Sequence, residues 1–90
     1  MMDSFIKNNR VCVVYFTNSD FEELNNKIVC LKQSIGESKI MFIDSNAELD
    51  LIGELNIKSV PLIHIYKNGA LIEEIFGTYN NICEIISLHF

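Results

Sequence analysis

The fold is decided by the stretch Ser59-Val60-Pro61-Leu62-Ile63-His64-Ile65-Tyr66-Lys67-Asn68-Gly69. The apolar, β-branched and aromatic residues from Leu62 to Lys67 predict a β-strand. Asn68-Gly69 predicts a tight hairpin turn, because both residues tolerate positive φ angles. A second apolar run, Leu71–Phe76, follows the turn. The stretch therefore predicts an antiparallel hairpin whose first strand is entered through Pro61.

The residues upstream of this hairpin predict a strand, a helix and a second strand. Val11–Phe16 is an unbroken apolar run, which is typical of a strand buried on both faces of a parallel or mixed sheet. Ser19 followed by Glu22 matches a capping box, which predicts a helix start, and Gly36 predicts its end. Lys39–Ile43 is the second strand. The helix carries one apolar stripe, made by Phe21, Leu24, Ile28, Leu31 and Ile35.

Two further helices are predicted. Ser45 followed by Glu48 matches another capping box, ahead of a short helix that ends near Asn56. Asn80 or Asn81 is expected to cap a last helix, whose apolar residues are Ile82, Ile85, Ile86 and Phe90. The element order is β-α-β-α-β-β-α, which indicates an α/β fold with a mixed central sheet of about four strands flanked by helices. Residues 1–90 form a single domain.

Composition excludes several classes of protein. The 90 residues are 49% hydrophobic with a mean hydropathy of +0.21, which excludes intrinsic disorder. A net charge of −5 argues against a nucleic-acid or anionic-membrane surface. No apolar run reaches the roughly 18 residues that a membrane helix needs, and the first residues do not resemble a signal peptide. We therefore expect a cytoplasmic protein without nucleic-acid or membrane partners.

The element order and the Val60-Pro61 to Asn68-Gly69 segment resemble the thioredoxin family, and Gly77 stands after the next strand, as in that family. The resemblance covers roughly residues 10 to 90. It implies a thioredoxin fold in which the peptide bond before Pro61 is cis. Only about ten residues precede the Val11–Phe16 strand, so the chain resembles an N-terminally trimmed thioredoxin that lacks the family's first strand.

The chemistry of the family is not matched. The family's WCGPC segment is replaced by residues 17–24, which contain no cysteine, and Tyr15 stands where many thioredoxins carry a buried acid. Disulfide exchange needs an accessible thiolate with a lowered pKa. We therefore expect no standard disulfide reductase activity, no cofactor and no catalytic residue at this place, although whether the protein is an enzyme stays open.

The resemblance implies that a peptide-binding groove remains. Strand addition beside the proline loop needs backbone groups rather than a thiol. The leading hypothesis is a redox-inactive module that binds a protein or peptide partner. The alternative, in which Pro61 only starts a strand and shapes a loop, stays open. The groove residues would be Ser59, Val60, Pro61, Asp20, Phe21, Gly77 and Thr78.

The three cysteines support a different hypothesis. Cys12, Cys30 and Cys83 form no CxxC motif and no convincing zinc pattern with the two histidines, so no metal site is expected. Free cysteines are usually buried core residues, and this is the first interpretation for all three. The alternative is a thiol-disulfide oxidoreductase-like protein that uses one unconventional cysteine. Cys83, near a helix start, and Cys30 are its candidates.

Three remaining expectations concern single features. His64 is expected to be a partly buried, hydrogen-bonded histidine on the same strand face as Leu62 and Tyr66, and His89 is expected to be solvated. Glu73-Glu74 is expected to form the wet side of an edge strand. Separately, a homodimer is a third hypothesis, because the missing first strand could leave a sheet edge or apolar patch exposed, which a second copy of the chain would cover.

Overall fold

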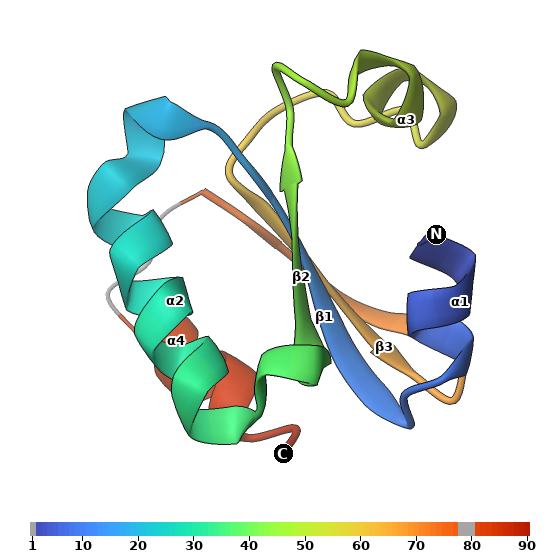
Figure 1. Cartoon of the computed structure of the whole chain (residues 1–90), viewed down its shortest axis with the longest axis vertical. Helices are drawn as coiled ribbons and strands as arrows, with labels where there is room; N and C mark the ends of the chain where they lie inside the picture. The colour runs from blue at the N-terminus through green and yellow to red at the C-terminus, as the bar shows by residue number, and fades with distance from the viewer. Residues whose placement is uncertain (1, 78–80) are drawn as a thin grey trace.

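A four-stranded mixed sheet lies between two layers of helices in the computed structural model, which describes residues 2–77 and 81–90 (Figure 1). The sheet order is β2-β1-β3-β4. β1 is parallel to β2 and antiparallel to β3, and β3 is antiparallel to β4. The strands are β1 (Val11–Thr17), β2 (Ile40–Asp44), β3 (Leu62–Lys67) and β4 (Ala70–Phe76). The predicted mixed α/β sheet is confirmed.

The helices cover both faces of the sheet. α2 (Glu22–Ile35) and α4 (Ile82–Ser87) lie on one face, and α1 (Met2–Lys7) and α3 (Leu49–Glu54) lie on the other (Figure 1). Short 3-10 turns at Ser19–Phe21 and Glu37–Lys39 precede α2 and β2. β1 is central, so its side chains are buried between both layers, as its unbroken apolar run predicts.

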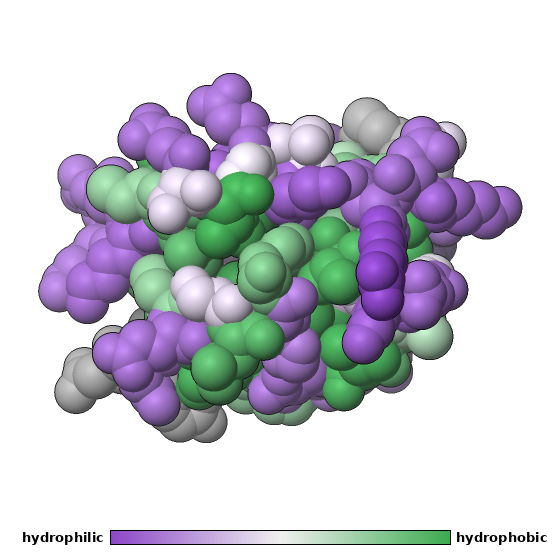
Figure 2. Space-filling model, turned by 90° about the horizontal axis from the view of Figure 1, so that it is seen from below, coloured by the Kyte–Doolittle hydropathy of each residue, from purple (hydrophilic) through white to green (hydrophobic). Residues whose placement is uncertain are grey.

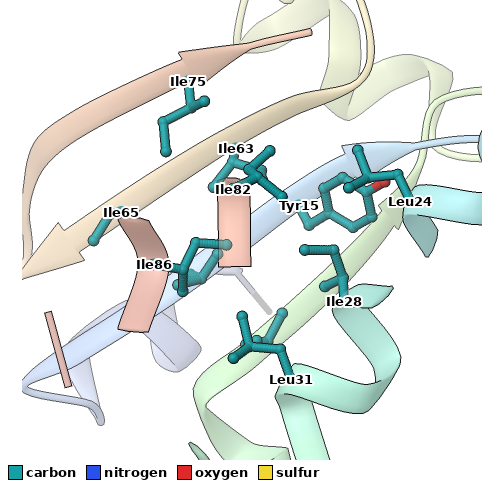
Figure 3. Close-up of a cluster of buried hydrophobic side chains, with 11 residues drawn as sticks. Tyr15, Leu24, Ile28, Leu31, Ile63, Ile65, Ile75, Ile82 and Ile86 are labelled. Carbon is teal, nitrogen blue, oxygen red and sulfur yellow. The ribbon is translucent and has the colours of Figure 1, made fainter. Parts of the chain in front are cut away.

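The larger core lies under α2 and α4. The apolar stripe of α2 meets the inward-facing residues of β1 and β3 and the buried side of α4 (Figure 3). Tyr15 is fully buried and packs edge-on against Phe42, with ring centroids 5.1 Å apart. The labelled members of this cluster are Tyr15, Leu24, Ile28, Leu31, Ile63, Ile65, Ile75, Ile82 and Ile86.

A smaller core lies on the opposite face. Its buried residues are Val14, Phe16, Ile43 and Leu62, and apolar side chains of α1 and α3 pack against them. Because side chains alternate along a strand, β1 supplies Val13 and Tyr15 to one core and Val14 and Phe16 to the other. The two cores therefore hold both helical layers on one sheet.

The hairpin and the end of α2 follow their sequence signals. Asn68 and Gly69 have φ angles of 53° and 83°, which gives the tight turn between β3 and β4. Gly36 has a φ of 123°, and its backbone N–H donates to the carbonyl of Lys32, 3.0 Å away. All three positions have positive φ angles, which favour glycine or asparagine because this region is costly for other residues.

Asn81 occupies the cap position of α4, as predicted, although its side chain makes no cap hydrogen bond, whereas the two predicted capping boxes are wrong. Ser19 does not cap α2, because a 3-10 turn intervenes and Phe21 occupies the cap position without a side-chain hydrogen bond. The side chain of Asn18 accepts from the backbone N–H of Asp20 instead, at 2.9 Å. Ser45 does not cap α3 either, because Glu48 occupies the cap position and its N–H donates to the backbone carbonyl of Asp44 at 2.9 Å. Asn18 and Asp44, each one residue upstream of the predicted serine cap, instead form local side-chain turns, and Asp44 Oδ1 accepts from the N–H of Asn46 at 2.8 Å.

Candidate functional site: the proline-loop end of the sheet

Three segments of the chain meet at one end of the sheet, near the start of α2 (Figure 1). Phe16 pairs with Leu62, and Leu62 pairs with Phe76, so the end of β1, the start of β3 and the end of β4 are neighbours. The N–H of Gly77 donates to the carbonyl of Pro61 at 3.0 Å, which continues the β3–β4 ladder past the strand end. The Val60–Pro61 peptide bond is cis.

Ser59 and Val60 form one side of this end. Ser59 is exposed and Val60 is half-buried, whereas Pro61 is buried. Among the described residues, the backbone N–H and C=O groups of Ser59 and Val60 have no hydrogen-bond partner. Backbone polar groups near the surface are satisfied by water or by a ligand. These groups are therefore available to an extended segment that approaches the loop.

The turn after β1 forms the other side. Because Phe16 pairs with Leu62, Thr17 and the turn that follows it lie beside Pro61. Asp20 is exposed in this turn and Phe21 is half-buried. The fold therefore brings the predicted groove residues Ser59, Val60, Pro61, Asp20, Phe21 and Gly77 to one end of the sheet. Thr78, the seventh, lies outside the described residues.

A hydrogen-bond network centred on Asn25 fixes the turn. Its Oδ1 accepts from the Tyr15 hydroxyl at 2.7 Å and from the Thr17 hydroxyl at 2.6 Å. Its Nδ2 donates to the carbonyl of Asn18 at 2.9 Å. One amide side chain thus satisfies two hydroxyls from β1 and one loop carbonyl, which holds the turn against the first turns of α2.

Asn25 was not singled out from the sequence, although one signal was present. Asparagine is disfavoured inside helices because its side chain competes for backbone groups, and Asn25 sits beside Leu24 on the inward side of α2. Burial raises the pKa of the Tyr15 phenol, and its hydrogen-bonded neighbour Thr17 opposes that shift. Tyr15 is therefore a neutral, buried phenol that donates a hydrogen bond.

The three cysteines differ in their surroundings. Cys12 is fully buried in β1, as expected of a core thiol. Cys30 is exposed on α2, so its interpretation as a core residue is wrong. Cys83 is half-buried on α4, and burial raises the pKa of its thiol while the Lys27 ammonium opposes the shift. The start of α4 therefore does not lower the pKa of the Cys83 thiol below its ordinary value.

Both histidines pair with carboxylates of β4. His64 Nε2 lies 2.6 Å from Glu74 Oε2, and His89 Nε2 lies 2.6 Å from Glu73 Oε2. The side chain of His64 is 8% exposed and that of His89 is 27% exposed. The predicted hydrogen-bonded His64 is confirmed. His89 is not simply solvated, because the end of the chain returns to β4.

Within residues 2–77 and 81–90, no three His, Cys, Asp or Glu side chains come together as a metal site would require. In the same part of the chain, every helix is too short or too polar to cross a bilayer. A cavity of about 690 Å³ runs beside β2, where Phe5, Met41 and Phe42 line it. It lies along an edge of the sheet and away from the proline loop.

Comparisons with known proteins identify the fold. No protein-family model and no curated protein sequence matches the chain. Among solved structures, thioredoxin from Fasciola hepatica is similar with a TM-score of 0.83 and 19% identity, over 99% of this chain and 91% of that chain. A thioredoxin from Plasmodium falciparum is similar with a TM-score of 0.79 and 20% identity, over 99% and 91%.

A third structure agrees with these two. Mitochondrial thioredoxin 3 from Saccharomyces cerevisiae is similar with a TM-score of 0.70 and 18% identity, over 98% of this chain and 83% of that chain. At such low sequence identity, the similarity shows a shared backbone arrangement and not a shared chemistry. The chain has the thioredoxin fold.

Proposed function

We propose that the protein is a redox-inactive binding module that holds an extended peptide or protein segment against the Ser59–Val60 loop. The observation that carries the proposal is the pair of backbone groups on Val60 that have no partner among residues 2–77 and 81–90, next to a turn that contains no thiol. An added strand would hydrogen-bond to these groups and contact the side chains of Asp20 and Phe21. The net charge of −5 favours neutral or basic segments.

The proposal is tested with short random peptides displayed on phage and selected on the folded protein. Selected peptides are titrated into isotopically labelled protein, and amide shifts are followed by NMR. We expect the largest shifts at Ser59, Val60, Asp20, Phe21 and Gly77. Selected peptides that shift only residues of β2 or the hairpin turn would contradict the groove.

A backbone modification separates strand addition from side-chain contact. Methylation of the peptide nitrogen that pairs with Val60 removes one hydrogen bond, and we expect affinity to fall about tenfold. Methylation of the next peptide nitrogen is the matched control, because neighbouring N–H groups of a strand point to opposite edges. Equal losses at both positions would exclude pairing with Val60.

A separate assay tests whether the module is redox-inactive. Reduction of a test protein disulfide by dithiothreitol is followed with and without this protein, and we expect no acceleration. Cys30→Ser and Cys83→Ser variants address the alternative, in which one unconventional cysteine gives oxidoreductase-like activity. Acceleration that disappears in one of these variants would favour the alternative over the redox-inactive module.

A homodimer is a second candidate, favoured by the outer edge of β2. Among the described residues, β2 has β1 as its only neighbour, and the 690 Å³ cavity runs beside it. Two copies of β2 paired antiparallel about Met41 and Phe42 would place Lys39 of each copy opposite Asp44 of the other. Such cross-strand ion pairs stabilise antiparallel pairing.

Sedimentation equilibrium tests the dimer. We expect a concentration-dependent dimer, which Lys39→Asp weakens because an acidic side chain of one copy then faces Asp44 of the other. The double variant Lys39→Asp with Asp44→Lys restores the opposite charges and should restore dimerisation. A monomeric mass at the highest soluble concentration would exclude the dimer and leave the groove proposal intact.

A further inference from the structure

Helices α2 and α4 pack side by side on one face of the sheet, although they are far apart in the sequence (Figures 1 and 3). Ile28 and Leu31 of α2 and Ile82 and Ile86 of α4 belong to the same core cluster. The position after Ile82 is Cys83, which packs against the edge of this cluster. The fold thus brings Cys83 to the surface of α2.

Cys30 lies on the same part of α2. The Sγ of Cys83 makes a weak hydrogen bond to the carbonyl oxygen of Lys27, 3.9 Å away. Lys27 precedes Cys30 by about one helical turn. Because Cα–Cβ bonds of a helix tilt toward its N-terminus, the side chain of Cys30 leans over the turn that contains Lys27. Both thiols therefore approach the same patch of α2.

The two thiols share one pocket. An open pocket of about 440 Å³ is lined by Cys30, Cys83, Leu31, Lys27 and Asn26. Both cysteines are free, whereas Cys12 is sealed inside β1. Cys30 is exposed and can meet a reagent from solution, and Cys83 is half-buried at the same pocket. This arrangement supplies one accessible thiol and one neighbouring thiol that can resolve an adduct.

The geometry points to a reversible dithiol site on α2 and α4, in which Cys30 and Cys83 form a disulfide when they meet a small disulfide such as oxidised glutathione. The Cys30 thiolate attacks one sulfur of glutathione disulfide, which forms a Cys30–glutathione mixed disulfide and releases one glutathione thiolate. The Cys83 thiolate then attacks the Cys30 sulfur and releases the second glutathione. The two cysteines lose two electrons, the glutathione disulfide gains them, and the thiol protons pass through solvent to the released thiolates.

This site is separate from the proline loop and does not depend on peptide binding. It is oxidised by a small disulfide and need not accelerate the reduction of protein disulfides, which is the activity that the proposed redox-inactive module lacks. It also differs from the fold family's CxxC site, because it joins two helices rather than two positions within the turn at the start of one. Burial of Cys83 raises the pKa of its thiol, which lowers the thiolate fraction and slows the second step near neutral pH. The mixed disulfide at Cys30 should therefore be detectable before it closes.

The test uses the reduced full chain and glutathione disulfide. Samples are quenched with acid at intervals, alkylated, and measured by intact mass and peptide mapping. We expect a transient glutathione adduct on Cys30, followed by a species lighter than the reduced chain by two hydrogen atoms, with Cys30 and Cys83 peptides linked. Dithiothreitol should reverse the change. The link should raise the melting temperature by about 10 °C, since a disulfide restricts the unfolded chain.

Single variants locate the two thiols. Cys83→Ser should keep the Cys30 adduct, with a lifetime more than about tenfold longer than in the wild type, because the neighbouring thiol no longer resolves it. Cys30→Ser, at an exposed position, should prevent closure without loss of the fold. Cys12→Ala is the matched control, because it has the same number of thiols as the other two single variants. It should form the Cys30–Cys83 disulfide as the wild type does.

A second measurement does not depend on oxidation. Phenylarsine oxide binds two neighbouring thiols together, and we expect one equivalent to bind the wild type and Cys12→Ala. Cys30→Ser and Cys83→Ser should lose this binding. A wild-type glutathione adduct as long-lived as that of Cys83→Ser, a linked peptide that contains Cys12, or arsenical binding that survives both single variants would overturn the proposal.

Discussion

His64 and Glu74 face each other across the β3–β4 pair, with His64 Nε2 2.6 Å from Glu74 Oε2. The imidazole is buried and stacks edge-on between Phe16 and Tyr66, with centroid distances of 5.2 and 6.1 Å. Its Nδ1 is buried and has no partner among the described residues. Glu74 is therefore the only described hydrogen-bond partner of this imidazole, and it pairs with Nε2.

The cost of losing a carboxylate should depend on how deeply its histidine is buried. Glu74→Ala leaves the 8%-exposed His64 without its partner, and we expect the free energy of unfolding to fall by about 1–2 kcal/mol. Glu73→Ala is the matched control, because its partner His89 lies at the same 2.6 Å distance but is 27% exposed. We expect a loss of about 0.5 kcal/mol or less there. Urea denaturation measures both, and equal losses would contradict the role of burial.

Asn25 should be among the most sensitive polar residues of the chain. Asn25→Ala removes the acceptor of the Tyr15 and Thr17 hydroxyls and the donor to the Asn18 carbonyl. Unsatisfied buried groups are costly, so we expect a loss of about 2–3 kcal/mol in the free energy of unfolding. Asn26→Ala, at the exposed neighbouring position, should change it by less than about 0.5 kcal/mol. A similar stability for both variants would refute the network.

The pattern of apolar residues was sufficient to predict the strands and helices of the fold, but not the hydrogen bonds at the helix starts. The apolar runs of β1 and β3 and the Asn68-Gly69 turn predicted the sheet, because burial and turn geometry act over a few neighbouring residues. Ser19 failed as a cap because Asn18 offers a competing acceptor to the same turn. Sequence patterns compare residue types and cannot rank such competing hydrogen bonds.

For a related reason, the sequence predicted the proline loop but neither the Asn25 network nor the proximity of Cys30 and Cys83. The proline loop carries its own local signal in Val60-Pro61, so its position was predictable. Asn25 depends on two hydroxyls of β1, and the proximity of Cys30 to Cys83 depends on how α4 packs against α2. Contacts between distant segments appear only when the chain is folded, and no single segment encodes them.

The Tyr15 phenol should make the protein less stable in alkaline solution. Its pKa is raised in the folded state by burial, so the folded protein keeps a proton that the unfolded chain releases above about pH 10. The contribution of the Tyr15 phenol to the free energy of unfolding is fully present below about pH 10. It is lost as the pH rises from there toward the raised pKa of Tyr15 in the folded protein. Urea unfolding at pH 8 and at pH 10.5 should therefore show a drop in stability.

Tyr15→Phe separates this effect from the general effect of high pH. The variant loses the hydrogen bond to Asn25, so it should be less stable than the wild type at pH 8. Its further loss between pH 8 and pH 10.5 should be smaller, because it has no phenol to titrate at this position. A pH dependence identical to that of the wild type would show that Tyr15 does not contribute to it.

Gly69 and Gly53 should respond in opposite directions to the same substitution. Gly69 has a φ of 83° in the hairpin turn, where an alanine is strained, so Gly69→Ala should lower the free energy of unfolding by about 1 kcal/mol. Gly53 lies within α3, and an added Cβ meets no atom within 4 Å. Alanine restricts the unfolded chain and favours helix, so Gly53→Ala should raise the free energy of unfolding by about 0.5 kcal/mol. Thermal and urea unfolding of the two variants measure the signs, and a stabilising Gly69→Ala would show that the turn does not hold this residue in the left-handed region.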